Sequence, residues 1–446
     1  MEYEEFIKSK HRKNKNVGFD CDLSNSFLYD FQKKIIEFSL RRGKSAIFAD
    51  CGLGKTPMQL EFARQIIKKT NGNVLIVTPL AVGAQTCREA EKFGLDANKS
   101  IDGVLSNKIT VTNYERLHYF DKNDFNCIVL DESSILKNYA GKIRERITEF
   151  MKDIPYRLLC TATPAPNDFM EFGTSAEALS VMRRVEMLAE FFIHDSGSTQ
   201  EWKIKGHAGG AFWEWMSMWS RAIRKPSDLG FGDGDFKLKE MNVNHIMLNS
   251  KAASGRLFPL IASTLSEQRE SRHTSIDDRC NAVAEIANEN DRPFIAWCDL
   301  NDESKKLTNL INGAVEIKGS DTEEHKEKSM QDFSYGNIRC LVTKPSIAGF
   351  GMNWQHCADM SFFPSHSHEQ FYQATRRCWR FGQTKRVNCH MVYTESDCAI
   401  VDNLMRKEKN SNMIYDEIIK NMSEFQNGMV ENNYKPLMKM EPPKWM

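Results

Sequence analysis

The stretch that most constrains this chain lies at residues 49–56 and reads ADCGLGKT. An apolar run at 46–48 leads into it, and apolar residues with helical spacing follow from 57 to 67. A strand, a glycine-bearing turn, a Lys-Thr pair and a helix form the layout of a phosphate-binding loop. The alternative is a glycine-rich turn that caps a core strand, because Ala49 stands where the usual pattern has its first glycine.

The residues of this stretch have the chemistry that a nucleoside triphosphate requires. Gly52 and Gly54 let the backbone turn tightly and direct its N–H groups at an anion, so Gly52, Leu53 and Gly54 are all expected to bind ATP. We expect Lys55 to reach the β- and γ-phosphates of ATP and the Thr56 hydroxyl to bind Mg²⁺. The following helix points the positive end of its dipole at the same phosphates.

A glutamine precedes the loop in a segment with helical apolar spacing, residues 28–40. The amide of Gln32 can both donate to and accept from the edge of an adenine ring. Its position ahead of a phosphate-binding loop therefore predicts a contact with the base. The alternative is an ordinary surface glutamine.

Short apolar runs rich in β-branched residues alternate with helical stretches after the loop. Because such continuous runs are typical of strands buried on both faces, the pattern predicts a parallel sheet covered by helices on both sides. The runs are at 74–79, 109–112, 127–130 and 157–164.

Two of these runs end in residues suited to ATP hydrolysis. Asp131 and Glu132 follow the run at 127–130, at the end of a parallel strand where ligands bind. Asp131 is expected to complete the Mg²⁺ site and Glu132 to polarise the attacking water. The fourth run ends in Thr161, Ala162 and Thr163, which could sense the γ-phosphate and pass that state to another domain. A plain acidic loop and a Thr/Pro turn are the respective alternatives.

The chain of 446 residues is too long for one ordinary core, and a second alternating segment begins near residue 279. It ends in QATRRCWRFGQ at 373–383, where Arg377 and Arg380 are three residues apart and share a helical face. Two guanidiniums in a domain with no phosphate loop of its own suit arginine fingers that reach across a cleft. Gln373 lies on roughly the same side. The alternative is a surface helix with ordinary ion pairs.

The region between the two alternating segments is aromatic and basic. Tryptophans recur between 213 and 219, and Arg221 and Arg224 follow them. Aromatic and basic side chains together can stack on bases and bind phosphates. We expect Arg221 and Arg224 to contact DNA phosphates, whereas Trp213 and Trp219 at near-helical spacing are expected to pack in a core.

Composition limits the remaining classes of function. With 60 basic and 60 acidic side chains the net charge is zero, which gives no global argument for nucleic-acid binding. The 12 cysteines are scattered singly and predict reduced core thiols rather than a zinc site or disulfides. His366 and His368 lack further ligands at metal-binding spacing.

The sequence contains no run of 18 apolar residues, so no membrane span is predicted. The charged residues 1–16 lack the apolar core of a signal peptide, and we therefore expect a cytoplasmic protein. The basic cluster in that arm is expected to be a solvated tail, with a nucleic-acid arm as the alternative.

Taken in order, these motifs resemble those of superfamily 2 helicases and translocases, specifically the Swi/Snf-type branch in its compact bacteriophage and bacterial versions. The resemblance covers about residues 28–405. Its motifs are FQ at 31–32, ADCGLGKT at 49–56, VTPL at 77–80, TNYE at 112–115, DESS at 131–134, TATPAPND at 161–168, AGFGMN at 348–353 and QATRRCWRFGQ at 373–383.

The resemblance implies two RecA-like α/β domains with ATP and Mg²⁺ in the cleft between them. The expected limits are a polar arm at 1–27, domains at 28–180 and 255–405, a connector at 181–254, and a helical and polar tail at 406–446. The motif at 348–353 adds Gly351 and Asn353 to the ATP site. The first-domain motifs that contact nucleic-acid strands imply DNA contacts at Thr78, Pro79, Thr112 and Tyr114.

The function implied is a monomeric ATP-dependent translocase that moves along double-stranded DNA, in the host cytoplasm if it is encoded by a phage. Two alternatives stay open. One is a strand-separating DNA helicase of phage or bacterial replication, recombination or repair. The other is a nucleic-acid-binding scaffold with an inactive ATP site. Protein partners are not predicted.

Overall fold

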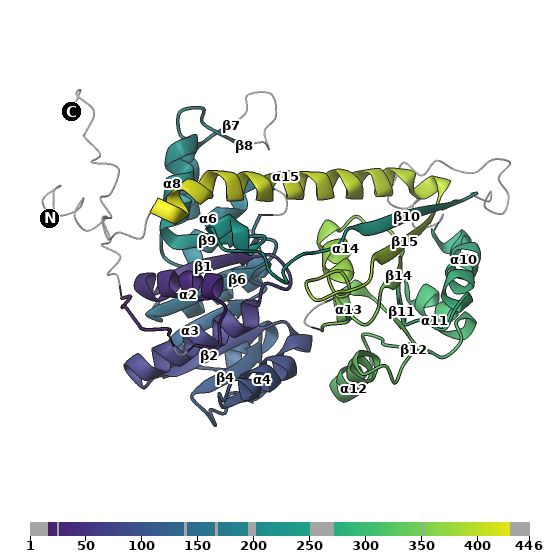
Figure 1. Cartoon of the computed structure of the whole chain (residues 1–446), viewed down its shortest axis with the longest axis horizontal. Coiled ribbons are helices and arrows are strands. Elements are labelled where there is room, and N and C mark those ends of the chain that lie inside the picture. The colour runs from purple at the N-terminus through teal and green to yellow at the C-terminus, as the bar shows by residue number, and fades with distance from the viewer. Residues whose placement is uncertain are drawn as a thin grey trace, which may run out of the picture.

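The computed structural model describes residues 17–24, 26–137, 141–165, 168–194, 202–249, 272–349 and 352–428. These residues form two α/β domains that lie side by side, each built on a parallel sheet (Figure 1). The basic arm at 1–16, Asn138, residues 166–167, Gly351 and the expected start of the second domain at 255–271 lie outside the described residues. Within the described ranges, none of the helices has both the length and the hydropathy needed to span a bilayer.

The first sheet has seven strands in the order β3-β4-β2-β5-β6-β1-β9, and every neighbouring pair is parallel. Its strands are β1 (Lys44–Ala49), β2 (Asn73–Thr78), β3 (Ala97–Lys99), β4 (Ile109–Asn113), β5 (Phe125–Asp131), β6 (Tyr156–Thr161) and β9 (Ser220–Ile223). The central strands are buried on both faces, as their continuous apolar runs predict.

Helices cover both faces of this sheet. One apolar cluster joins the sheet to α2, α3 and α4, and a second joins the opposite face to α5, α6, α7 and α8. The helices are α2 (Asp30–Arg42), α3 (Lys55–Thr70), α4 (Gly83–Lys92), α5 (Lys142–Met151), α6 (Phe172–Ala178), α7 (Arg184–Phe191) and α8 (Gly209–Trp219). A small antiparallel hairpin, β7 (Phe192–His194) with β8 (Trp202–Ile204), lies beyond α7.

The second sheet has six parallel strands in the order β10-β15-β14-β11-β13-β12. Helices α10 and α11 cover one face, and α12, α13, α14 and the start of α15 cover the other. The strands are β10 (Met241–Leu248), β11 (Phe294–Trp297), β12 (Ala314–Glu316), β13 (Cys340–Thr343), β14 (Asp359–Phe362) and β15 (Val387–Thr394). The helices are α10 (Ile276–Asn288), α11 (Asn301–Leu310), α12 (Glu323–Ser334), α13 (Pro345–Ala348), α14 (His368–Thr375) and α15 (Cys398–Gly428).

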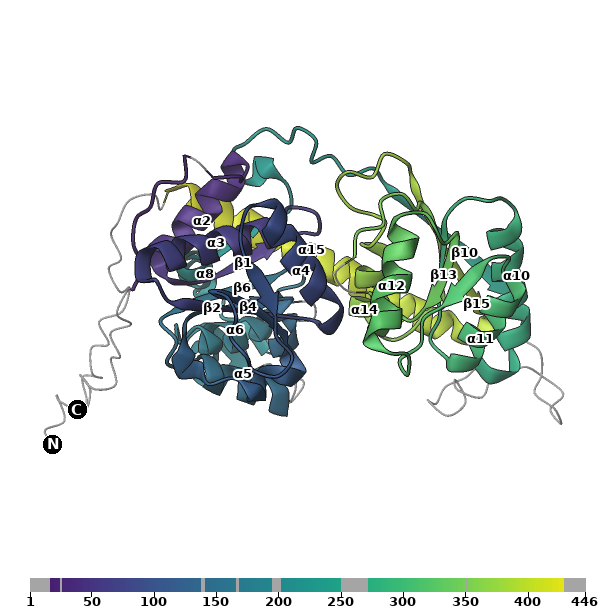
Figure 2. The same ribbon diagram turned by 90° about the horizontal axis from the view of Figure 1, so that it is seen from below.

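The limits of the two domains differ from those expected, because strands from the expected connector belong to both sheets. β9 pairs with β1 in the first sheet, with Arg221 opposite Ile47. β10 pairs along its whole length with β15 in the second sheet. The true link is therefore the segment between β9 and β10, which crosses from one domain to the other (Figure 2).

The helical part of the tail predicted at 406–446 belongs to α15 (Cys398–Gly428), which contacts both domains. α15 runs along one side of the molecule, from the second domain to the first (Figure 1). Val401 and Leu404 belong to the core of the second domain, whereas Ile418 and Met422 belong to the core of the first. The helix therefore joins the two hydrophobic cores directly.

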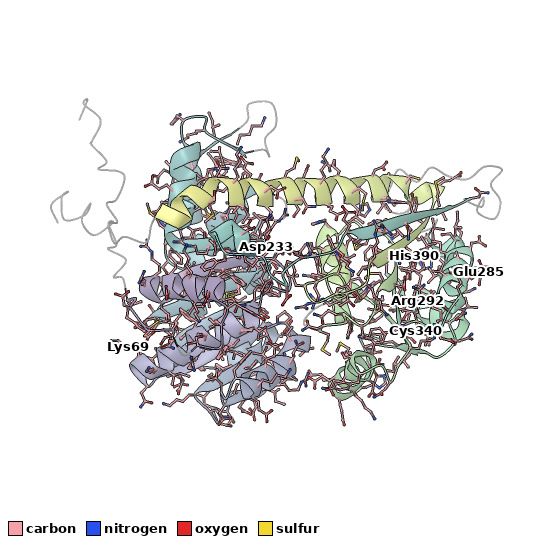
Figure 3. All side chains as sticks on the ribbon, in the orientation of Figure 1. Lys69, Asp233, Glu285, Arg292, Cys340 and His390 are labelled. Atoms are coloured by element: carbon pink, nitrogen blue, oxygen red, sulfur yellow. The ribbon has the colours of Figure 1, made fainter. Side chains whose placement is uncertain are left out.

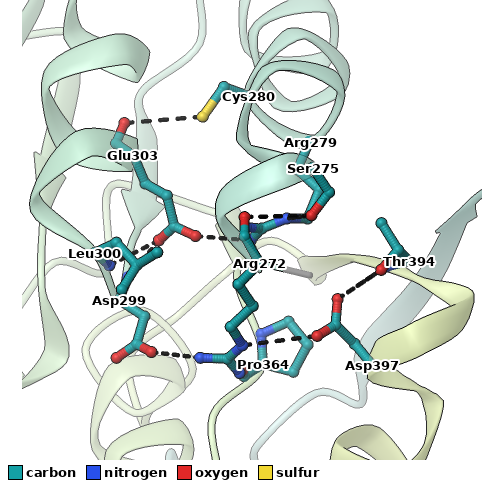
Figure 4. Close-up of polar contacts among 10 residues, drawn as sticks. All are labelled: Arg272, Ser275, Arg279, Cys280, Asp299, Leu300, Glu303, Pro364, Thr394 and Asp397. Carbon is teal, nitrogen blue, oxygen red and sulfur yellow. Dashed lines mark hydrogen bonds and ion pairs between the residues drawn. The ribbon is translucent and has the colours of Figure 1, made fainter. Parts of the chain in front are cut away.

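A buried polar network stabilises the second domain (Figure 4). The guanidinium of Arg279 pairs with the Glu303 carboxylate at 2.7 Å, and both side chains are almost fully buried. The second carboxylate oxygen of Glu303 accepts the backbone N–H groups of Asp299 and Leu300 at the start of α11. Arg272 reaches Asp299 at 2.6 Å from the other side. Because the buried charges are paired, this network ties α10 to α11.

Nine of the 12 cysteines are buried, as expected for core thiols. All 12 cysteines are free, and those in β5, β6 and β13 are fully buried. Figure 3 labels one of them, Cys340, in the second domain. Burial raises the pKa of the Cys340 thiol to about 12, so this thiol is protonated at neutral pH.

Candidate nucleotide site between the two domains

The loop at 50–54 adopts a conformation that requires glycine at two positions. Gly52 has a φ of 87° and Gly54 a φ of 77°, which only glycine adopts readily. A Cβ atom added to Gly54 would lie 2.3 Å from Nε2 of Gln32. Gly54 is also the residue that precedes α3, so the loop leads directly into the N-terminus of that helix. This is the geometry that the sequence predicted for a phosphate-binding loop.

Lys55 is the first residue of α3, and its ammonium group lies under the loop. Its Nζ donates to the carbonyl of Ala49 at 3.1 Å. Burial lowers the pKa of Lys55, but nearby Cys51, Glu132 and Asp131 outweigh that effect and leave the pKa raised. The side chain is therefore a cation held beside the two acids.

Asp131 and Glu132 lie where β5 ends. The Asp131 carboxylate accepts a hydrogen bond from Nε2 of Gln59 at 2.7 Å. Burial raises the pKa of both acids, and Lys55 opposes the increase. Glu132 has a φ of 51°, a left-handed conformation that costs a non-glycine residue energy and is often found at functional sites.

The second domain contributes two arginines, although not from a helix as expected. α14 ends at Thr375, and beyond it the carbonyl of Arg377 accepts the N–H of Trp354 at 2.9 Å. Arg377 donates to the carbonyls of Gln373 and Met352, and Arg380 donates to the side chain of Asn353.

These elements together enclose a cavity of about 210 Å³. The first domain supplies the loop, the acids and a side of α4, and the second domain supplies the two arginines and Asn353. The lining residues are Cys51, Gly52, Gly54, Lys55, Thr56, Pro57, Val82, Gln85, Thr86, Glu89, Asp131, Glu132, Asn353, Arg377 and Arg380. Residues from four predicted motifs, which together span more than 300 positions of the chain, therefore meet at one cavity.

Four other predicted residues of the ATP site lie elsewhere or outside the described residues, and one of them, Leu53, is fully buried and does not line the cavity. Gln32 is buried beside the loop, where its Nε2 donates to the carbonyl of Leu53 at 2.8 Å. Gln373 does not line the cavity, and its amide lies 3.4 Å from Oε1 of Glu369. Gly351 lies outside the described residues.

The residues expected to couple the domains lie at a domain junction. Oγ1 of Thr161 accepts the N–H of Thr163 at 3.1 Å. Ala162 and Thr163 line a small cavity of about 40 Å³ together with Tyr372 and Arg376 of the second domain. The end of β6 therefore faces the segment that carries the two arginines.

The polar side chains around the 210 Å³ cavity fit a nucleotide with Mg²⁺. The Thr56 hydroxyl and the Asp131 carboxylate are oxygen ligands of the kind that Mg²⁺ takes in combination with phosphate oxygens. Oε1 of Gln59 and Nε of Arg380 are buried without a hydrogen-bond partner. Among the described residues no group of three His, Cys, Asp or Glu side chains could hold a metal ion.

A second, larger cavity of about 860 Å³ lies between the domains. Pro79 and Tyr114, both predicted DNA contacts, line it, and Glu132 lines both cavities. Thr78 and Thr112 are buried, and their hydroxyls donate to backbone carbonyls of the first domain. These two side chains hold the domain together and do not face the cavity.

Three ion pairs join the domains around this second cavity. Lys99 pairs with Glu327 at 2.7 Å, and Arg116 pairs with Glu323 at 3.2 Å. Lys137 pairs with Glu369, which also accepts a hydrogen bond from Ser134. In each pair the first domain supplies the cation and the second domain the carboxylate.

The prediction of DNA contacts in the connector is wrong for Arg221. Its guanidinium is buried, donates to the carbonyls of Ser217 and Ser220, and stacks 3.4 Å from the ring centroid of Phe38. Burial lowers the pKa of Arg221 to about 9. Arg224 is partly exposed but is held by Asp416 at 2.5 Å, so it anchors α15. Trp213 and Trp219 are buried in the core, as expected.

Several residues at this junction were missed by sequence reasoning. Asp50, Gln59, Tyr372 and Arg376 all contact the predicted site residues or one another. Asp50 and Arg376 carry opposite charges within two of the quoted motifs. Their opposite charges were the available indication in the sequence. They do not indicate an ion pair until the two domains are placed together.

The comparisons with known proteins agree with this architecture. Residues 26–166 match the family model described as "Type III restriction enzyme, res subunit". The comparison with curated proteins found no match. The fold is similar to that of Saccharomyces cerevisiae Dbp5 bound to RNA and ADP BeF3, with a TM-score of 0.56, 10% sequence identity, and 89% of this chain and 94% of that chain covered.

A SWI2/SNF2 ATPase core from Sulfolobus solfataricus in complex with double-stranded DNA also matches, with 18% identity and a TM-score of 0.43 over 90% of this chain and 95% of that chain. From the fold shared with Dbp5, the two parallel-sheet domains are a tandem pair of RecA-like domains. The family match at residues 26–166 lies over the first of these two domains.

Proposed function

We propose that the protein hydrolyses ATP and uses the energy to move along nucleic acid, most specifically along double-stranded DNA. The observation that supports hydrolysis is the 210 Å³ cavity, where Lys55, Glu132 and the two arginines converge from both domains. A cavity that needs both domains can respond to the γ-phosphate by closing and opening, and such a change drives a motor.

Each side chain has a distinct role in this proposal. Lys55 and the loop N–H groups bind the phosphates, and Thr56 and Asp131 hold Mg²⁺, which neutralises charge on the transferring phosphoryl group. Glu132 orients the attacking water and accepts its proton. Arg377 and Arg380 stabilise the charge that develops in the transition state.

The second cavity supports the choice of nucleic acid as the track. It lies next to the catalytic acid, because Glu132 lines both cavities, and it is bounded by both domains. Pro79 and Tyr114 from the predicted strand-contacting motifs are on its wall, with Lys137, Lys142 and Lys326 nearby. The similar structure of Dbp5 has RNA bound to it, which supports a nucleic-acid ligand for this fold.

The choice of duplex DNA rests on the resemblance of the motif at 373–383 to the Swi/Snf-type branch, whose members track along duplexes. The strand-separating helicase is the second candidate. Splitting DNA costs about 1.4 kcal/mol per base-pair step and needs a wedge at the fork. The hairpin of β7 and β8 is the one antiparallel hairpin within the described ranges, and its described residues line neither interdomain cavity.

The test is an ATPase panel with double-stranded DNA, single-stranded DNA and RNA, together with two motion assays. We expect the greatest stimulation by double-stranded DNA, and displacement of a third, triplex-bound strand. Efficient unwinding of a forked duplex without triplex displacement would instead establish the helicase. Nucleotide binding without hydrolysis on any nucleic acid would establish the scaffold. Glu132→Gln is the negative control for all three assays.

A further inference from the structure

A buried ion pair joins the nucleotide loop of the first domain to the arginine segment of the second. Nη2 of Arg376 lies 3.2 Å from Oδ2 of Asp50, and the two residues are separated by 326 positions. Both residues are more than 90% buried. A buried ion pair is costly to break from one side, because the remaining charge is left without a partner.

Asp50 is connected to the loop as well as to the second domain. It follows β1, and its N–H donates to the carbonyl of Ile223 at 3.0 Å. Its Oδ1 accepts the N–H of Cys51 at 2.7 Å and the hydroxyl of Tyr372 at 2.6 Å. The carboxylate therefore holds the first amide of the loop and two side chains of the second domain simultaneously.

The surroundings of Arg376 fix its direction. Its guanidinium carbon lies 4.1 Å from the ring centroid of Trp379 and 5.0 Å from that of Tyr372. Burial alone would raise the pKa of the Asp50 carboxyl, but Arg376 and the hydrogen bonds from Tyr372 and Cys51 outweigh burial and lower it. The pair is therefore ionised at neutral pH and held in one geometry.

Arg376 is adjacent in sequence to Arg377, which lines the nucleotide cavity, and Arg380 follows within the same segment. The two neighbouring arginines point to different partners: Arg376 to Asp50 and Arg377 to the carbonyls of Met352 and Gln373. Fixing Arg376 to the loop therefore fixes the distance between the loop and the arginines that enter the cavity.

We propose that Arg376 is a positioning residue for ATP hydrolysis: its ion pair with Asp50, supported by Tyr372, sets the position of Arg377 and Arg380 against the phosphate-binding loop. This inference rests on the proposed function. Arg376 lines the small cavity together with Ala162 and Thr163, so the ion pair lies beside the end of β6. A movement at the end of β6 would therefore also move the ion pair between Arg376 and Asp50.

The proposal predicts different effects of Arg376 on turnover and on nucleotide affinity. The phosphate-binding groups, from Gly52 to Thr56, all belong to the first domain, whereas the arginines are brought to them by the second. Loss of Arg376 should therefore lower kcat and leave the affinity for nucleotide nearly unchanged. Loss of Asp50 should affect both, because Asp50 also holds the N–H of Cys51.

The experiment is a double-mutant cycle on the full chain with Arg376→Gln, Asp50→Asn and the combination. kcat is measured with DNA, and affinity is measured with a fluorescent non-hydrolysable ATP analogue and Mg²⁺. We expect Arg376→Gln to lower kcat by about tenfold or more, affinity to change by less than about threefold, and the double variant to lose little more than the single variants. Arg376→Lys should recover part of the activity, because it keeps the charge but not the planar geometry.

Arg279→Gln is the matched control, because Arg279 is equally buried and ion-paired but contacts Glu303 within the second domain. The effects of Arg279→Gln and Asp50→Asn on kcat, expressed as free energies, should therefore be additive. Additive effects of Arg376→Gln and Asp50→Asn, or equal losses in affinity and kcat for Arg376→Gln, would overturn the proposal.

A second measurement does not depend on ATP hydrolysis. Hydrogen–deuterium exchange should rise at residues 50–54 in Arg376→Gln and remain unchanged there in Arg279→Gln. If the wild-type protein does not hydrolyse ATP, this exchange difference still tests the contact while the proposed function fails separately. Unchanged exchange at the loop would overturn the positioning role. If Arg376→Gln does not fold, Tyr372→Phe tests the same contact by removing only the hydroxyl, with a smaller change expected in the same direction.

Discussion

The hydroxyl of Tyr415 donates to the carbonyl of Phe48 at 2.6 Å, which joins the last helix of the chain to the first strand of the first sheet across 367 positions. The same hydroxyl lies 3.3 Å from the carbonyl of Ile223 in β9. Since α15 starts in the core of the second domain, this contact makes it a direct structural link from that domain to the strand that leads into the phosphate-binding loop.

Removing that hydroxyl should destabilise the first domain. Tyr415→Phe removes a buried hydrogen bond, whose net contribution to stability is typically about 0.5–1.5 kcal/mol. The measurement is chemical or thermal unfolding of the full chain. Tyr335→Phe is the control, because Tyr335 is 76% exposed. Equal stability of the two variants would show that the contact does not stabilise the fold.

Glu132→Gln should retain nucleotide binding and lose turnover. The substitution keeps the shape of the side chain and removes the group that accepts a proton from water. Binding of a fluorescent ATP analogue and steady-state hydrolysis measure the two effects. Glu115→Gln, an exposed acid that lines the second cavity but not the first, is the control and should turn over normally when DNA is saturating. Hydrolysis by Glu132→Gln near the wild-type rate would show that another group is the base.

Arg380→Ala should lower kcat by about 10³-fold, as expected for an arginine that acts on the transition state, with a smaller change in ATP affinity. Arg377→Ala should have a similar effect and can also weaken ATP binding. Arg386→Ala is the control in the same domain, because its side chain is 58% exposed and pairs with Glu240. If Arg380→Ala lost affinity and turnover equally, Arg380 would be a ground-state contact instead.

The interdomain ion pairs predict that acidic residues of α12 oppose nucleic-acid binding. Neutralising Glu323 and Glu327 should free Arg116 and Lys99 and remove two negative charges from the cavity. Exposed pairs are worth at most about 1 kcal/mol, so DNA should bind up to about fivefold more tightly for each glutamine introduced. The salt dependence of binding should also become steeper. Glu324→Gln is the control, because Glu324 is exposed on the same helical turn and does not line the cavity. Unchanged affinity of the Glu323→Gln/Glu327→Gln protein would place the DNA elsewhere.

His368 predicts a loss of stability in mild acid. Burial lowers the pKa of His368 from 6.5 to about 4, and its Nδ1 is buried without a hydrogen bond. Between pH 4 and 6.5 the unfolded chain binds more protons at this site than the folded chain does, so stability falls as the pH falls through that window. A shift of this size corresponds to about 3 kcal/mol at the lower limit. Unfolding of the wild type and of His368→Leu between pH 4 and 7 measures the contribution, and identical pH profiles would contradict it.

The sequence by itself determined the features of the fold and of the candidate site that depend on residues close together in the chain. The loop at 49–56, the acids after β5 and the strands predicted from apolar runs depend on a few neighbouring residues, and the structure has them where they were expected. It also determined that Arg377 and Arg380 belong with the loop, through their motif, although the helix ends at Thr375 before reaching them.

Only the tertiary structure decided the contacts between distant segments. Arg221 is in a four-residue strand whose neighbours are fixed by pairing with β1, and that pairing buries a guanidinium that looked like a surface group. The limits of the domains, the role of α15 and the pair between Asp50 and Arg376 depend in the same way on which surfaces meet after folding. Local patterns cannot specify these contacts, because burial and pairing are properties of the assembled chain and no single segment contains both partners.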